Sequence, residues 1–247
     1  MKIIAVYCSK GGVGKTATSV NLAFTAARKG YASLLCDLDP QGASSYYFRI
    51  RPKKKFNSKQ LLHGNLQEFI RETDFDDLDL LPAHFSHRNI DLLLDKEKEK
   101  KNPILRKVLG SLEDDYDLVF LDCPPNLTLL SENIISSADM VVTPVIPTTL
   151  SVLALQQLLK LCKKTGVNKE KVHAFFSMAE QRKSMHLDVI SQYRKYAIFM
   201  KTIIPFLAEI EKMGVNRKPV GATQQNSRAA LAYERLLKEI EKRGKLR

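Results

Sequence analysis

A short run near the amino terminus combines glycines and two lysines in a pattern suited to holding a phosphate group. Residues 9–18 read SKGGVGKTAT, so three glycines lie around one valine, and Lys15 and Thr16 follow directly. Glycines let the backbone turn tightly and point successive N–H groups at one anion, and a following helix adds positive charge from its N-terminus. The Lys15 ammonium would reach the β- and γ-phosphates of a nucleotide, and the Thr16 hydroxyl would ligate Mg²⁺.

Three aspartates stand near the carboxyl ends of two apolar runs. Asp37 and Asp39 occupy alternate positions at the end of 32–39, and Asp122 lies near the end of 116–124. Open α/β sheets bind ligands at the carboxyl ends of their strands. Carboxylates suit Mg²⁺, which keeps several waters and takes few protein ligands. Each aspartate could instead cap a helix, so position alone leaves both interpretations open.

The elements that must position these residues alternate between apolar runs and longer helical patterns. Near-continuous apolar runs fit parallel strands that are covered on both faces. Strands are predicted at 2–8, 32–39, 116–124, 138–145, 172–178 and 197–205, and 78–83 is a further candidate. Helices are predicted at 16–30, 103–113, 128–136, 149–165, 184–196 and 227–243. This alternation predicts the α/β class, with a single doubly wound, mostly parallel sheet and helices on both faces.

The length of 247 residues fits one large α/β domain or two small ones. Because the chain shows no internal repeat and no domain-scale linker, we expect a single domain over 1–247. Two charged segments interrupt the pattern, a basic loop at 51–59 and a mixed-charge run at 95–102. Both are typical of solvated surface, and the first could also contact a phosphate backbone.

Cysteine usage and hydropathy indicate a cytoplasmic protein. The four cysteines, Cys8, Cys36, Cys123 and Cys162, are widely scattered without a C-x-x-C spacing. That distribution favours buried free thiols in a reducing compartment over a metal site or disulfides. The first thirty residues contain no pattern of a signal peptide, and no apolar stretch approaches the roughly 20 residues of a transmembrane helix.

Four segments together resemble the ParA/MinD family of P-loop ATPases with a deviant Walker A motif. KGGVGKT at 10–16 is similar to the family's phosphate loop, and DLDPQG at 37–42 is similar to its second nucleotide motif. LVFLDCPP at 118–125 resembles the motif on the Mg²⁺ side. The segment from TIIP to NRKPV, residues 202–220, resembles the base-pocket region of ParA-type partition proteins. The resemblance covers nearly the whole chain and is weakest from about 49 to 110.

The resemblance implies roles for these residues in a Mg²⁺-dependent ATPase that binds ATP and ADP. Lys10 would cross to the partner subunit of an ATP-dependent homodimer and contact its nucleotide phosphates. Lys10, Lys15 and Asp39 would be catalytic, with Asp39 positioning the attacking water. Thr16, Asp37 and Asp122 would hold the Mg²⁺ and its waters. The loop residues implied to contact the nucleotide are Lys10, Gly11, Gly12, Val13, Gly14, Lys15, Thr16 and Ala17.

The resemblance also places an adenine pocket at the ends of the strands at 172–178 and 197–205. Met178 and Pro205 would pack on the base. The family often has Arg and Asn after the proline, whereas Phe206 and Leu207 stand here. The resemblance therefore does not assign the polar contacts to the base.

Positive charge is concentrated near the carboxyl terminus. Residues 194–247 carry thirteen Lys or Arg and five Asp or Glu, a net +8 of the total +12. This excess favours a polyanion, either nucleic acid or an anionic membrane, although a solvated helical face explains it equally well. In the ParA/MinD family the basic residues that contact DNA lie in this region. Here it contains Arg194, Lys195, Arg217, Lys218 and Arg228.

These observations predict an ATP-dependent dimerising ATPase that binds DNA without sequence preference and is associated with the nucleoid in its ATP state. The resemblance implies that it positions a plasmid, chromosome or protein assembly and that a ParB-like activator or cargo adaptor stimulates its weak hydrolysis. The alternative is a MinD-like ATPase at the membrane surface. Residues 230–247 form a poor membrane anchor, because Leu246 is the only apolar residue with a bulky side chain after Ile240. A metal-cluster ATPase is disfavoured, because Cys123 has no suitably spaced partner.

Overall fold

The structure is a computed structural model that describes residues 1–96 and 103–246 of the chain. The last six residues of the mixed-charge run predicted at 95–102 lie outside the described residues.

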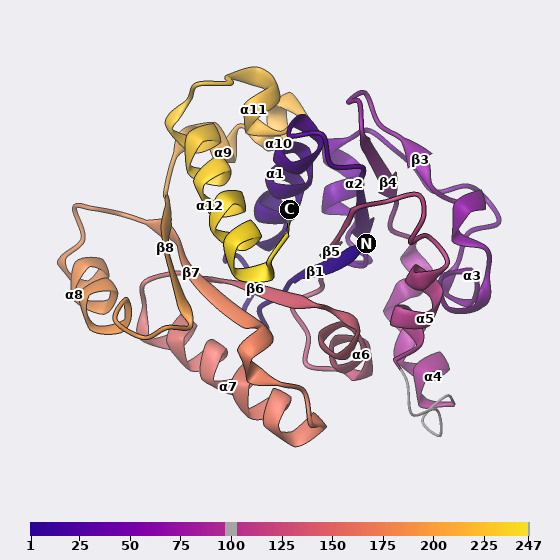
Figure 1. The fold of residues 1–247 in the computed structure, drawn as a ribbon, viewed down its shortest axis with the longest axis horizontal. Helices are drawn as coiled ribbons and strands as arrows, with labels where there is room; N and C mark the ends of the chain where they lie inside the picture. The colour runs from indigo at the N-terminus through magenta and orange to yellow at the C-terminus, as the bar shows by residue number, and fades with distance from the viewer. Residues whose placement is uncertain (97–102, 247) are drawn as a thin grey trace.

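Within the described residues, eight strands form one sheet in the order β3-β4-β2-β5-β1-β6-β7-β8 (Figure 1). Strand β3 pairs antiparallel with β4, and every other neighbouring pair is parallel. The strands are β1 Lys2–Val6, β2 Ser33–Asp37, β3 Arg71–Glu72, β4 Leu78–Leu81, β5 Leu118–Asp122, β6 Met140–Val145, β7 Val172–Ala179 and β8 Phe199–Pro205. The predicted α/β class with a doubly wound, mostly parallel sheet is confirmed, and the candidate strand at 78–83 corresponds to β4.

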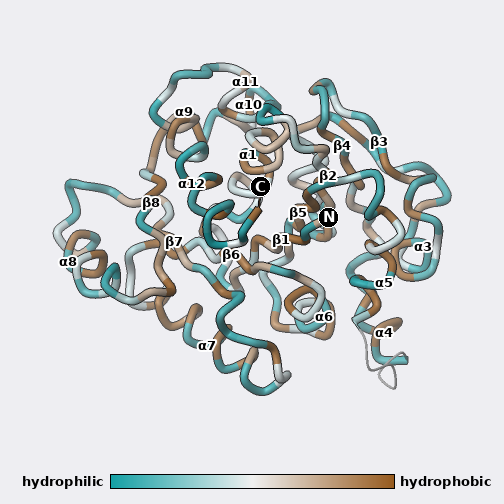
Figure 2. Tube along the Cα trace, viewed as in Figure 1, coloured by the Kyte–Doolittle hydropathy of each residue, from teal (hydrophilic) through white to brown (hydrophobic). Residues whose placement is uncertain are grey.

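Helices cover both faces of the sheet, and the alternation of side chains along each strand divides the core between them. Ile3 and Ala5 of β1 pack in one core cluster with residues of α3 to α8, whereas Ile4 and Val6 pack in another with residues of α1 and α10 to α12. Figure 2 shows the central strands as largely hydrophobic and much of the outer chain as hydrophilic. The helices are α1 Lys15–Arg28, α2 Ala43–Tyr47, α3 Ser58–His63, α4 Ile90–Asp95, α5 Ile104–Gly110, α6 Leu129–Ser137, α7 Thr149–Thr165, α8 Ser184–Tyr193, α9 Ala208–Glu211, α10 Met213–Asn216, α11 Val220–Thr223 and α12 Arg228–Gly244.

The last helix, α12, closes one edge of the sheet. The carboxylate of Glu239 accepts hydrogen bonds from the backbone N–H groups of Lys201 and Thr202 in β8, at 2.7 and 3.0 Å. Arg243, one turn further along α12, donates to the carbonyl of Phe199 at 2.9 Å. An unprotected edge strand offers its N–H and C=O groups to other chains. The two side chains therefore cover the start of the β8 edge and fix how α12 lies against it.

The long helices and the buried strands were predicted within a few residues of their observed bounds. The sequence analysis missed α2 to α4, α9 to α11 and the strand β3. These elements have two to six residues, and too few apolar positions repeat in them to reveal a period. None of the described helices combines the length and the apolar character needed to cross a membrane.

Candidate active site

The glycine-rich loop joins the carboxyl end of β1 to the first turn of α1, as the sequence predicted. Gly12 and Gly14 adopt positive φ angles of 70° and 90°, a region in which a side chain would be strained. At Gly14 a Cβ would also meet the Ser177 hydroxyl at 3.1 Å. Gly11 and Gly12 are exposed, so their backbone N–H groups are accessible to a ligand. The loop thus has the open, tightly turned backbone that an anion nest requires.

Lys15 opens α1 and is 7% exposed. Its Nζ donates to the backbone carbonyl of Lys10 at 3.1 Å, so the ammonium is folded back across the loop. A buried ammonium is costly unless oxygen atoms accept its hydrogen bonds, and here the Lys10 carbonyl is one such acceptor. Phosphate oxygens bound in the loop would supply stronger, charge-assisted partners.

Lys10 lies at the other end of the loop and points to helix α7 of the same chain. Its Nζ donates to the hydroxyl of Ser151 at 3.0 Å, and Thr148, the residue before α7, donates its hydroxyl to the same oxygen at 3.1 Å. Lys10 is only partly buried. The predicted contact of Lys10 with a partner subunit stays a prediction, and making it would break the bond to Ser151.

Two of the three predicted carboxylates lie side by side beneath the loop. Asp37 and Asp122 end the neighbouring strands β2 and β5 and are in register with each other. They are 1% and 0% exposed. Two carboxylates this deeply buried repel one another and lose hydration, which is a costly arrangement unless hydrogen bonds or a cation offset it.

Serine hydroxyls supply much of that compensation. Asp122 accepts hydrogen bonds from Ser19 of α1 at 3.2 Å and from Ser44 of α2 at 2.7 Å. One Asp37 oxygen, Oδ2, accepts from both the backbone N–H and the hydroxyl of Ser45, at 2.8 and 2.7 Å. The other oxygen, Asp37 Oδ1, is buried without a hydrogen-bond partner.

The pKa values of Asp37 and Asp122 depend on two opposing effects, burial and hydrogen bonding. Burial raises the pKa of the Asp37 carboxyl above its usual range, and the charge of Asp122 raises it further. Burial also raises the pKa of Asp122, while the hydroxyls of Ser44, Thr16 and Ser19 oppose the shift. The pair therefore resists carrying two negative charges when no cation is present. Hard oxygen donors with an unpartnered buried oxygen among them fit a Mg²⁺ ion and its waters.

The third carboxylate, Asp39, lies nearer the surface. It is partly exposed, and its Oδ1 accepts a hydrogen bond from the N–H of Gln41 at 2.9 Å. It does not cap helix α2, because the N-cap is Gly42 and no side chain bonds there. Asp39 lines the same cavity as Lys15 and Thr16, which leaves its carboxylate accessible to a molecule bound there.

A cavity of about 410 Å³ extends from the loop to the ends of β7 and β8. Gly11, Gly12, Gly14 and Lys15 to Ala17 line its loop side, and Met178 and Pro205 line its far side, where the adenine contacts were predicted. Met178 has a φ of 54°, unusual for a residue with a side chain. Phe206 and Leu207 also line the cavity, so its far side is largely apolar. Of the predicted nucleotide contacts, Lys10 and the buried Val13 do not line it.

The five predicted DNA contacts lie in three segments of the chain. Arg194 and Lys195 are exposed after α8, at the left side of Figure 1. Arg217 is half-buried, lies 4.4 Å over the ring of Tyr46 and donates its Nε to the Tyr46 carbonyl at 3.1 Å. Lys218 follows it and is exposed. Arg228 is exposed at the start of α12.

Sequence reasoning missed the serines that hold the carboxylates. Ser44 and Ser45 follow DLDPQGA directly, and Ser19 lies four residues after Lys15. A hydroxyl one turn inside the first helix, and a pair of hydroxyls after an acidic loop, are weak signals, because serine is common at helix starts for other reasons. Only the register of β2 and β5 shows that these three hydroxyls converge on two carboxylates.

Comparison with known proteins identifies relatives along the whole chain. A family model described as an AAA domain matches residues 1–174. The sporulation initiation inhibitor protein Soj of Bacillus subtilis is 32% identical over 259 residues, which cover 98% of this chain and 99% of that protein. The chromosome partitioning protein ParA of Myxococcus xanthus is 29% identical, with 98% and 88% covered.

Among solved structures, the septum site-determining protein MinD from Pyrococcus horikoshii, in complex with Mg-ADP, superimposes with a TM-score of 0.78. It is 20% identical and covers 98% of this chain and 96% of that one. At this identity the likeness shows a common fold.

Proposed function

Because the chain belongs to the ParA/MinD family of P-loop ATPases, we propose that it is an ATP- and Mg²⁺-dependent ATPase of the partition type, folded as one domain over 1–247. The main support for this proposal is that the Gly11–Thr16 loop lies close to three carboxylates at one end of the sheet. These are Asp37, Asp39 and Asp122. ATP binds in the cavity of about 410 Å³, with its phosphates in the loop and its base toward Met178 and Pro205.

The residues of the site divide the work by charge. The loop N–H groups and the Lys15 ammonium bind the phosphates, and the start of α1 adds the positive end of its dipole. Thr16, Asp37 and Asp122 would hold Mg²⁺ and its waters, and the bound ion would neutralise negative charge on the transferring phosphoryl group. Asp39 orients the attacking water from its accessible position in the same cavity.

Lys10 makes turnover depend on a pair of subunits. Charge develops on the phosphoryl oxygens in the transition state, and a cation from the neighbouring subunit stabilises it as an arginine finger does. In the single chain Lys10 is bonded to Ser151, so the dimer must draw it from that position. A ParB-like activator or cargo adaptor then raises the slow hydrolysis rate.

The ATP-bound dimer binds nucleoid DNA without sequence preference and thereby positions its cargo. The net charge of +12 supports a polyanion partner. The membrane alternative requires a free apolar helix face near the carboxyl terminus. Leu236, Leu237 and Ile240 of α12 are all 0% exposed, because they pack in the core.

Nucleotide binding and sedimentation of the purified full chain test this function. Lys15→Ala should weaken ATP binding at least a hundredfold, about 2.7 kcal/mol. Lys10→Ala should retain ATP binding and lose dimer-dependent turnover. Retained ATP affinity in Lys15→Ala would remove the site assignment, and full-speed hydrolysis by a monomer would remove the partition mechanism.

DNA binding has its own test. Replacing Arg217 and Lys218 by Glu should weaken the binding of the ATP-state dimer to duplex DNA and flatten its dependence on salt. An unchanged slope would mean that these two residues do not contact the phosphates.

A further inference from the structure

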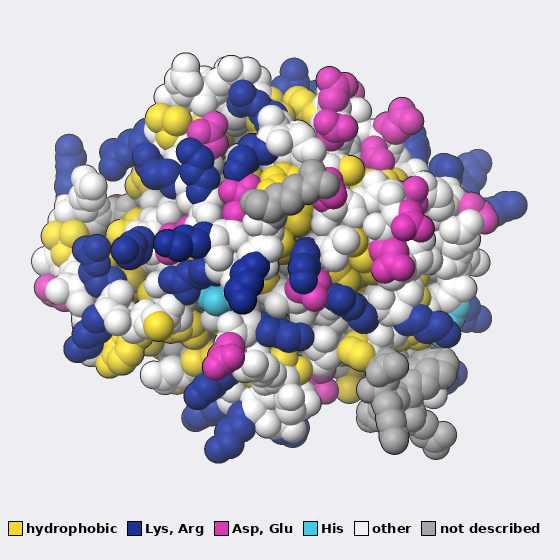
Figure 3. Space-filling view, in the orientation of Figure 1, with side chains coloured by type: hydrophobic (Ala, Val, Ile, Leu, Met, Phe, Trp, Pro, Cys, Tyr) yellow, Lys and Arg dark blue, Asp and Glu magenta, His cyan; other side chains and the backbone are white. Residues whose placement is uncertain are grey.

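Four basic side chains of α12, and the lysine at its C-cap, follow one another along the outer side of this helix. Arg228, Arg235, Lys238, Lys242 and Lys245 follow one another with Leu231 at spacings of three and four residues, the repeat that places residues on one face of a helix. All five are exposed. Figure 3 shows Lys and Arg gathered over α12 and the neighbouring β8. We call these five residues the α12 line; it extends about 25 Å at 1.5 Å per residue.

The acidic residues of α12 do not neutralise the α12 line. Sequence spacing alone suggests a Glu241–Lys245 pair four residues apart. The structure instead directs Glu241 to Lys29 of α1 and to the hydroxyl of Tyr31. Glu239 is bonded to the β8 edge and to Arg243. Both carboxylates are thus engaged on the inner sides of the helix.

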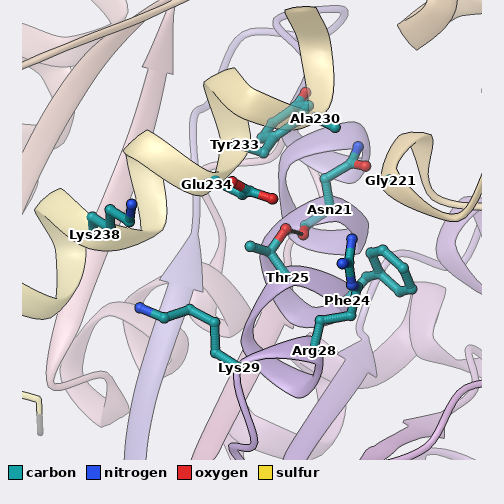
Figure 4. Close-up of a pocket in the computed structure, with 10 residues that line it drawn as sticks. All are labelled: Asn21, Phe24, Thr25, Arg28, Lys29, Gly221, Ala230, Tyr233, Glu234 and Lys238. Atoms are coloured by element: carbon teal, nitrogen blue, oxygen red, sulfur yellow. Dashed lines mark hydrogen bonds between the residues drawn. The ribbon is translucent and has the colours of Figure 1, made fainter. Parts of the chain in front are cut away.

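Glu234, the remaining acid, lines a pocket of about 210 Å³ between α1 and α12. Figure 4 shows its carboxylate directed into this space, whereas the guanidinium of Arg28 from α1 lies beside the ring of Phe24. Lys238 and Lys29 line the same pocket. Glu234 is therefore turned toward α1, and Arg28, which is exposed, adds a cation beside the α12 line.

No ion pair joins any of the five side chains of the α12 line to another residue within 1–96 or 103–246. In most exposed helices opposite charges alternate and pair locally. Here the fold uses the acids elsewhere and leaves a row of unpaired cations. Such a row suits a partner that carries regularly spaced negative charges.

We propose that the α12 line binds the phosphate backbone of duplex DNA. This inference rests on the DNA-binding part of the proposed function and adds four cations to its predicted contacts, since only Arg228 belongs to both sets. About 25 Å of duplex carries about 15 phosphate charges, enough to face all five cations. The contacts are to phosphates alone, so the binding has no sequence preference.

An anionic lipid surface fits this face less well. A helix that lies on a membrane inserts bulky apolar residues between the lipids. On the outer face of α12 only Leu231, 39% exposed, is available for this, since the other large apolar side chains are in the core. Cations without an apolar face match a solvated phosphate backbone.

The α12 line is complete within one subunit. Four of its residues belong to α12, and Lys245 is the C-cap of that helix. Helix α12 packs directly on α1, whose first turn follows the phosphate loop. The line therefore binds DNA weakly without nucleotide. Dimerisation doubles the number of contacts and raises the affinity through valence.

The test measures binding of a random-sequence 30-base-pair duplex by fluorescence anisotropy between 50 and 300 mM KCl, with and without ATP. Arg235→Gln/Lys238→Gln/Lys242→Gln should reduce the magnitude of the slope of log affinity against log salt by up to about 2.7 for each DNA-bound subunit, because each phosphate contact contributes about 0.9. The matched control is Lys160→Gln/Lys163→Gln/Lys164→Gln, which removes the same charge from exposed positions on α7. The control should keep the slope of the unmodified protein.

Several results would decide the matter. An unchanged slope in the α12 triple variant, with circular dichroism and ATP binding intact, overturns the inference while wild-type DNA binding leaves the proposed function standing. Absence of any DNA binding by the unmodified protein overturns both. Vesicles of phosphatidylcholine with 30% phosphatidylserine provide the lipid arm, and stronger binding to them than to the duplex would also overturn the inference.

Discussion

Charged side chains are buried near the first turn of helix α1 and exposed near its last turn. At its first turn, Lys15, Asp37 and Asp122 are almost excluded from water, and serine hydroxyls or backbone groups bond to them. At its last turn, α1 meets α12, whose outer cations are exposed and unpaired within the described residues. The first region is arranged for one ligand held in one geometry. The second suits a partner recognised by charge density alone.

The difference has an energetic basis. A buried charge costs several kcal/mol unless its partners are complete, so each group at the phosphate site depends on its neighbours. An exposed cation costs almost nothing to maintain and gains little from any single contact. We therefore expect single substitutions to have large effects at the carboxylates and small effects at the junction of α1 with α12.

The largest effect on stability should come from Asp37→Asn, when the free energy of unfolding is measured at several pH values without Mg²⁺. Folding raises the pKa of Asp37 to about 8, so the folded state keeps a proton that the unfolded chain loses near pH 4. Its contribution to stability is full below pH 4 and is lost as the pH rises through 8. Urea unfolding should find the variant more stable relative to wild type at pH 8 than at pH 5, by about 2–4 kcal/mol. A difference independent of pH would contradict a protonated Asp37.

A smaller effect is expected for Ser45→Ala. The Ser45 hydroxyl donates to Asp37 at 2.7 Å and accepts from the N–H of Ala83 at 2.9 Å, so its loss leaves two buried groups short of a partner. The free energy of unfolding should fall by about 1–3 kcal/mol. Ser111→Ala is the control, because that hydroxyl is exposed and donates to the carbonyl of Val108 within the same helical turn. Equal losses for the two serines would remove the contrast between the buried site and the surface.

The smallest effect should follow Lys29→Met at the junction of α1 and α12. The Lys29–Glu241 ion pair is partly exposed, with side-chain exposures of 37% and 12%. Its loss should lower the free energy of unfolding by no more than about 1 kcal/mol, measured by urea unfolding. The freed Glu241 should slightly weaken duplex binding. A loss of stability as large as that of Ser45→Ala would show that this junction is as demanding as the carboxylate site.

The phosphate site was predictable to the extent that its residues are close in sequence. The loop from Gly11 to Thr16 is recognisable from the spacing of its glycines, lysine and threonine. Its position between a strand and a helix follows from the hydrophobic pattern of the flanking residues. The alternate positions of Asp37 and Asp39 likewise indicated a strand end. The hydroxyls of Ser44 and Ser45 were not predictable, because they contact their carboxylates only after β2 and β5 pair in register.

The polyanion surface was predictable only as an excess of charge. Residues 194–247 contain thirteen Lys or Arg and five Asp or Glu. These counts do not show which of the basic side chains form no ion pair. Arg217, a predicted DNA contact, lies over the ring of Tyr46, whereas Lys238, which the sequence did not single out, is exposed.

By itself the sequence determined the parallel α/β fold and the phosphate loop, because both depend on short-range periodicity and on glycine conformations that the chain encodes locally. The tertiary structure alone decided which charges are used up inside the protein. Glu239 and Glu241 are turned inward by β8 and α1, segments that lie about forty to two hundred residues away along the chain. Coulombic pairing depends on distance in space, which sequence spacing does not supply.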